Sequence, residues 1–167
     1  MSGPTPDTPD TPQPGSATIL AALTAVTWVA AVVAVFGLLS LFTGLEVIAQ
    51  RAAGPLLGPL SVALAAAALF ATLRGASRGR VGLWGCALAA TAVSFAVLVV
   101  GGVAQLLLTA APTTVWQGFL WGAFVRPFYP AAAVLGGLCG AAFWAANAYR
   151  ATGGRRPRWP WEDPFDE

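Results

Sequence analysis

Few residues of this chain carry groups that could do chemistry, and two of them, Glu46 and Arg126, have opposite charges. Each lies in a segment between long apolar runs, so an ion pair between them could join two connections of the fold. An ionisable group beside such runs is by default a candidate for a functional site. We favour a structural pair, or two hydrated charges, over a substrate site, because side chains at helix ends reach water at little cost.

The other reactive side chains are sparse. The chain has no His, and its two cysteines, Cys86 and Cys139, are expected at different depths of separate helices, so neither a usual zinc site nor a disulfide is expected. The apolar runs otherwise offer only hydroxyls, Gln105 and Asn147. Catalysis needs a nucleophile, an acid or a metal at one place. We therefore expect a protein that is not an enzyme and that holds no metal or cofactor.

The composition indicates the environment in which these residues lie. Hydrophobic residues make up 57% of the 167 residues and charged residues only 10%, whereas soluble domains carry about 25% charged residues. This balance excludes a soluble globule, a disordered chain and a nucleic-acid-binding module. The formal net charge of +2 is too small to imply a polyanionic partner. The composition predicts an integral membrane protein whose first partner is the lipid bilayer.

The charged residues divide the chain into four apolar runs, each long enough to cross a hydrocarbon core of about 30 Å as a helix. A transmembrane barrel would need alternating polar residues, but residues 62–70 are apolar throughout. We therefore predict an all-α, polytopic membrane protein, with one transmembrane domain over residues 17–150. Its four transmembrane helices are expected at about 18–43, 55–73, 81–110 and 128–149.

The arginines predict the orientation of these helices. The chain has no Lys, and with four spans seven of its nine Arg fall on the side that holds both termini. Only Arg51 and Arg126 fall on the opposite side. Basic residues near helix ends remain cytoplasmic, so we expect a multi-pass membrane protein with both termini in the cytoplasm.

The third connection, residues 112–130, is apolar and aromatic but interrupted by Gly and Pro. Thr113 or Thr114 could cap a short helix within it. We favour a helix that lies on the outer membrane surface, where the aromatic side chains would be interfacial. The alternative is a re-entrant segment, because irregular backbone at membrane depth usually lines a cavity.

The last span contains a pair of glycines four residues apart, Gly136 and Gly140, within a stripe of small residues. Small residues let helix backbones approach closely where lipid supplies no hydrophobic driving force. We favour packing inside the bundle over the alternative of a homodimer face, because the motif is common in a chain rich in Ala and Gly. The oligomeric state is left open.

The two ends of the chain differ from the spans. Residues 1–16 are rich in Pro and Thr and are expected to be disordered. Residues 151–167 form a tail in which Arg residues are followed by aromatic and acidic ones. This tail is either a topology signal with a disordered end or a docking motif for a membrane or cytosolic protein. The candidate docking residues are Trp159, Trp161, Glu162, Asp163 and Phe165.

Several features together resemble small four-helix membrane proteins of high-GC actinobacteria that have no assigned function. They are the spans rich in Ala and Gly, the use of Arg without Lys, and two short segments, Gly54-Pro55-Leu56-Leu57-Gly58-Pro59 and Arg158-Trp159-Pro160-Trp161-Glu162-Asp163. The resemblance covers most of the chain and implies a plasma-membrane location without a particular activity. We expect a non-enzymatic accessory or scaffold protein; the alternative is a small transporter or channel subunit that acts as an oligomer.

Overall fold

The structure is a computed structural model that describes residues 14–45, 57–79, 81–110 and 112–151. The described part is all α-helical, and four of its helices are long and apolar enough to cross a membrane, which confirms the predicted fold class. The helices are α1 (Pro14–Thr43), α2 (Leu57–Ala76), α3 (Leu83–Leu108), α4 (Thr113–Val125) and α5 (Phe128–Ala151).

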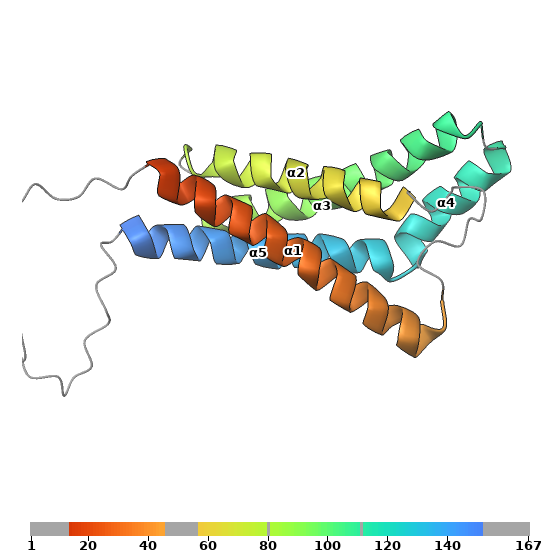
Figure 1. Ribbon diagram of the computed structural model, residues 1–167, viewed down its shortest axis with the longest axis horizontal. Helices are drawn as coiled ribbons and strands as arrows, with labels where there is room; N and C mark the ends of the chain where they lie inside the picture. Colours follow the sequence, from red (N-terminus) through yellow and green to blue (C-terminus); the bar gives the residue numbers. More distant parts are fainter. Residues whose placement is uncertain (1–13, 46–56, 80, 111, 152–167) are drawn as a thin grey trace, which may run out of the picture.

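The four long helices form an up-down-up-down bundle. Each contacts two neighbours: α1 packs on α2 and α5, and α3 packs on α2 and α5. Figure 1 shows these helices running along the length of the molecule, with the start of α1 and the end of α5 at one end and α4 at the other. Because four helices cross a membrane in alternating directions, the beginning of α1 and the end of α5 lie on the same side of it.

The helix bounds differ slightly from those predicted. Helix α1 begins at Pro14, inside the segment expected to be disordered, because proline suits the first turn of a helix, where its missing N–H is not needed. Helix α2 continues past Arg74 to Ala76, so this charge lies in its last turn. An Arg there can extend its head group to water while its stem covers apolar surface.

The outside of the bundle is apolar, as expected of helices that face lipid. Hydrophobic residues surround α1 evenly, so this helix has no polar face. Large side chains such as Leu41, Phe42 and Leu88 are mostly exposed. A soluble monomer does not display such continuous apolar surface.

The interior is formed by stripes of small and aliphatic residues spaced three or four apart along each helix. Such spacing places side chains on one face of an α-helix. The stripes of the first two helices contain Ala21, Ala25, Trp28 and Val32 in α1, and Ser61, Ala65, Leu69 and Leu73 in α2. Half of these residues are Ala or Ser, and such small side chains let the helices approach closely where they lie.

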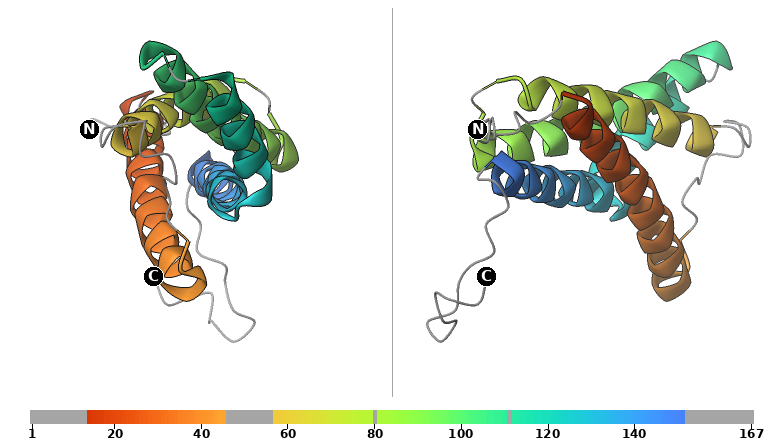
Figure 2. Two further views of the ribbon diagram at one scale, coloured as in Figure 1. Left: turned by 90° about the vertical axis from the view of Figure 1, so that its right-hand side faces the viewer. Right: turned by 60° about the vertical axis from the view of Figure 1, so that its left-hand side comes forward.

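Trp28 is the largest fully buried side chain and ties α1 to α5. Its Nε1–H donates a hydrogen bond to the carbonyl oxygen of Ala132, 3.1 Å away. A second contact between α1 and α5 lies farther along α1, where the rings of Phe36 and Phe128 pack edge to face with their centroids 5.4 Å apart. Beyond Val32 no described residue of α1 is buried, and the end of this helix diverges from the bundle (Figure 2).

We expect Trp28→Phe to lower the free energy of unfolding by about 1 kcal/mol, because it removes an interhelical hydrogen bond and leaves the Ala132 carbonyl without its donor. Unfolding can be followed by circular dichroism during titration of the protein in mild detergent with sodium dodecyl sulfate. Trp84→Phe is the matched control, since Trp84 is 77% exposed. Equal stability of the two variants would contradict the assigned role of Trp28.

Candidate functional site

The contact between α3 and α5 places Gly136 and Gly140 in the interior of the bundle, where both are buried. A Cβ atom on Gly140 would lie 2.8 Å from the Cβ of Ala90 and 3.0 Å from the carbonyl oxygen of Cys86. A Cβ on Gly136 would lie 3.0 Å from the carbonyl oxygen of Ala90 and would also collide with Ser94 Oγ. Both glycines therefore face a helix of the same chain, and their role here is close packing within the bundle.

Two polar side chains of α3 lie in this glycine contact. The Cys86 thiol donates a hydrogen bond to the carbonyl oxygen of Gly140, with sulfur and oxygen 3.4 Å apart. The Ser94 hydroxyl is fully buried and has no hydrogen-bond partner within the described part of the chain. The contact is thus made by backbone and small side chains, with little room for water between the helices.

Helix α4 packs along α3, from its middle to its end, through aromatic side chains. The Phe119 ring lies directly on Gly102, where any Cβ would collide with it. Phe119 also meets the Tyr129 ring of α5 edge to face at 5.8 Å. Near the other end of α4, the rings of Phe124 and Phe95 lie 5.3 Å apart. Along α4 the contacts advance from Phe119 to Phe124, whereas along α3 they go back from Gly102 to Phe95. Helix α4 therefore runs antiparallel to α3.

The contact with Phe95 lies well before the end of α3. Phe95 lies 13 residues before Leu108, the last residue of α3, which corresponds to about 20 Å along a helix. Helix α4 is itself 13 residues long, too short to cross a hydrocarbon core of about 30 Å. These contacts place α4 relative to α3 and α5 and not relative to a membrane surface. The surface helix favoured from the sequence and the re-entrant alternative therefore both stay predictions.

Arg126 follows the last turn of α4, and its backbone N–H donates to the carbonyl oxygen of Gly122 at 2.9 Å. Its Cδ and Nε atoms lie 3.7 Å from the position that a Cβ of Gly122 would occupy. The stem of this side chain therefore runs back over the preceding turn of α4, towards the end of the bundle. Arginine in a membrane commonly extends towards the surface in this way.

Some predicted features lie elsewhere or outside the described residues. Glu46 lies outside them, so its pairing with Arg126 stays a prediction, and so does docking through the tail residues 159–167. Neither Thr113 nor Thr114 caps α4, because the helix begins after Pro112 without a side-chain cap. The Trp28 bond was not predicted, since its acceptor is a backbone atom 104 residues away.

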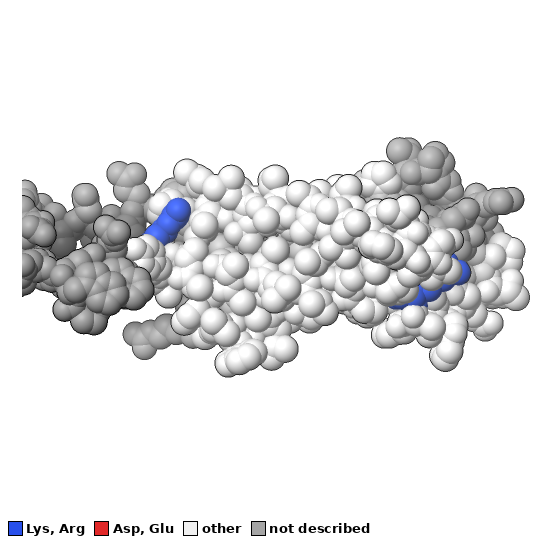
Figure 3. Space-filling view, turned by 90° about the horizontal axis from the view of Figure 1, so that it is seen from below, with Lys and Arg blue, Asp and Glu red and all other residues white. Residues whose placement is uncertain are grey.

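The described charges lie only at the two ends of the bundle. Figure 3 shows the arginines of one face near its ends, with an uncharged surface between them. Arg74 and Arg150 lie in the last turns of α2 and α5, and Arg126 follows α4. A middle region without charge is what a hydrocarbon environment requires.

Comparison with known proteins gives one match. A family model described as "Family of unknown function (DUF6121)" matches residues 13–167. No curated protein and no solved structure matches the chain. The match includes all five helices and assigns no activity to them.

We expect Gly136→Ala to destabilise the bundle by about 1–3 kcal/mol, because its Cβ would overpack the contact with Ala90 and Ser94. Gly37→Ala is the control: a Cβ there meets no atom within 4 Å, so this variant should keep or slightly gain stability. Adding Ser94→Ala to Gly136→Ala should recover part of the loss in the same unfolding titration. A fully stable Gly136→Ala protein would refute the close contact.

The antiparallel course of α4 can be tested by cross-linking. In a Cys86→Ala, Cys139→Ala background, Phe95→Cys and Phe124→Cys should be joined by a short bifunctional maleimide within one chain, because these side chains are neighbours. Phe95→Cys with Val115→Cys is the control, since Val115 packs near Leu106 at the other end of α4. Equal cross-linking of both pairs, measured by mass spectrometry of peptides, would argue against the antiparallel packing.

Proposed function

The chain belongs to DUF6121, a family of unknown function, and we propose that it is a non-enzymatic accessory or scaffold protein of a bacterial plasma membrane. In this role it holds other proteins at the membrane and conducts no solute itself. The four apolar helices fit a multi-pass membrane protein, and in the proposed role they anchor the chain in the bilayer.

The observation that carries the proposal is the close packing of the bundle interior. The glycines of α5 lie against the backbone of α3, and Trp28 of α1 lies against the backbone of α5. A path for ions or polar solutes needs polar groups that replace hydration water. The buried residues of the described helices are nearly all Ala, Gly, Leu and aromatic residues, which favours a packed body over a channel.

We further propose that both termini lie in the cytoplasm. Arg74, Arg78 and Arg150 lie at the end of the bundle where α1 begins and α5 ends, and the excess of basic residues favours that side as cytoplasmic. The candidate docking residues of the tail, Trp159 to Phe165, would then face cytosolic proteins. Aromatic side chains among acids are typical of short segments that order on binding.

A transporter or channel subunit is the second candidate, and the course of α4 favours it. A half-length helix that turns back into a bundle is common beside substrate and ion sites of transporters. Here Phe124 in the last turn of α4 contacts Phe95 of α3, and Arg126 follows α4. Since four packed helices enclose little space, such a pathway would have to form between copies of the chain.

Thiol labelling distinguishes the two candidates. In a Cys86→Ala, Cys139→Ala background, single cysteines replace Gly118, Gly122 or, as a water-exposed control in the α2–α3 turn, Arg78. For a scaffold in lipid vesicles, we expect a membrane-impermeant maleimide added to both sides to label the turn much faster than either glycine site. Rapid labelling at Gly122 as well as Gly118 would indicate an aqueous path and would contradict the scaffold proposal.

The second measurement addresses the partner directly. We expect the full chain, purified in mild detergent, to retain a bound protein that is lost when residues 159–167 are deleted and retained when residues 1–12 are deleted. The tail deletion leaves all described helices intact, so a loss of the partner is not a loss of fold. Retention of the same partner by both deletions would contradict docking through the tail.

A further inference from the structure

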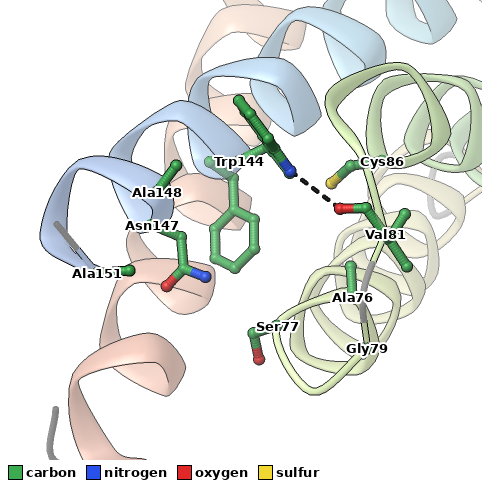
Figure 4. A pocket seen from close by; sticks show the side chains of 10 residues that line it. Ala76, Ser77, Gly79, Val81, Cys86, Trp144, Asn147, Ala148 and Ala151 are labelled. Carbon is green, nitrogen blue, oxygen red and sulfur yellow. Dashed lines mark hydrogen bonds between the residues drawn. The ribbon is translucent and has the colours of Figure 1, made fainter. Parts of the chain in front are cut away.

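A small pocket lies at the end of the bundle opposite α4, between the end of α5 and the turn that joins α2 to α3 (Figure 4). Its volume is about 140 Å³. Its walls include Ser77 from the turn, Val81 just before α3, Cys86 in the first turn of α3, and Trp144 and Asn147 from α5. The pocket therefore needs three separate segments of the chain, which explains why the sequence did not predict it.

One wall of the pocket is fixed by a hydrogen bond. The indole Nε1–H of Trp144 donates to the carbonyl oxygen of Val81 at 2.9 Å, so the end of α5 is held against the connection that leads into α3 (Figure 4). The Ser77 hydroxyl donates to the carbonyl oxygen of Arg74 at 2.8 Å, which holds the turn on the other side. Both walls are thus positioned before any ligand binds.

Asn147 supplies hydrogen-bond donors to this space. Its half-buried amide extends from α5 towards the turn, and no hydrogen bond joins it to another residue of the described chain (Figure 4). A primary amide carries two N–H donors and one acceptor. A ligand with several oxygen acceptors could therefore accept hydrogen bonds from the N–H groups of Asn147, in place of water.

The charges around the pocket are positive. Arg78 lies between two lining residues of the turn, Ser77 and Gly79, and Arg150 precedes the lining residue Ala151. None of the described residues is Asp or Glu, so no described carboxylate opposes these charges. This electrostatic environment favours an anion over a cation.

Two exposed aromatic residues indicate the depth of the pocket in a membrane. Trp84, 77% exposed, lies in the first turn of α3, and Tyr149, 51% exposed, lies in the last turns of α5. Trp and Tyr with exposed rings are enriched at the level of lipid head groups. The pocket lies between the same two helix ends, so it is open at head-group depth.

We propose that this pocket binds the phosphate of an anionic phospholipid from the adjacent leaflet, with the Asn147 amide donating to a phosphate oxygen. Arg78 and Arg150 make this end of the bundle positive, although the Arg150 guanidinium also donates to the carbonyl oxygen of Ser16 in α1 at 3.4 Å. A volume of about 140 Å³ is several times what one water molecule needs, so a phosphate group can enter the pocket, whereas the acyl chains of a phospholipid are far larger. The chains would remain in the bilayer beside the apolar outer surface. This site is independent of the scaffold function, since it requires no protein partner.

The test is lipid-dependent thermal stability of the full chain in neutral detergent. Added phosphatidylglycerol should raise the unfolding temperature by mass action, whereas phosphatidylcholine at the same concentration should do so much less. Asn147→Leu should weaken the apparent affinity for phosphatidylglycerol about tenfold, because a hydrogen bond to a charged group is lost. Asn147→Asp should weaken it further, since its carboxylate repels phosphate.

Each variant is compared with its own lipid-free unfolding temperature, so a general loss of stability does not obscure the result. Gln117→Leu is the control, because it removes an exposed amide from α4 at the other end and should bind phosphatidylglycerol like the native chain. Unchanged affinity in Asn147→Leu, or equal stabilisation by phosphatidylcholine, would overturn the proposal. Saturation by inorganic phosphate alone would assign the pocket to a free phosphate and would overturn the lipid as its source.

Discussion

The close approach of α5 to α3 decides where the other helices of this protein can lie. Lipid supplies no hydrophobic force between helices, so their association depends on packing and on hydrogen bonds. Gly136 and Gly140 allow that approach and fix the level of α5 against Ala90 and Ser94. The same stretch of α5 then presents the Ala132 carbonyl to Trp28, and thus positions α1.

The position of α5 along α3 also explains why α4 has to turn back along α3. Phe128 begins α5 eight residues before Gly136, about 12 Å along the helix, and therefore near the level of Gly102 in α3. Helix α3 continues to Leu108, about 9 Å farther, so the chain has to return towards the middle of the bundle before α5 can start. Helix α4 makes this return, and Phe119 can lie against α3 because Gly102 has no side chain.

The fold class could be predicted from charge placement alone, because a membrane tolerates charge only near its surfaces, and four long uncharged runs follow from nine Arg and seven acids. The packing of α4 on α3 could not, since Trp116, Phe119 and Phe124 suit a membrane surface and a helix contact equally well. The pocket could not either, because Ser77 and Asn147 meet only after α2, α3 and α5 have packed. Helical periodicity describes one helix at a time and carries no information on which residues of different helices come into contact.

The Trp28 hydrogen bond has a consequence for how the protein is made. Trp28 belongs to α1, and its acceptor, Ala132, is made 104 residues later, in α5. At about 5–20 residues per second, α1 waits roughly 5–20 s in the membrane before its indole finds that partner. During this interval α1 has only α2 of its two bundle neighbours, so synthesis of α5 completes the assembly of α1.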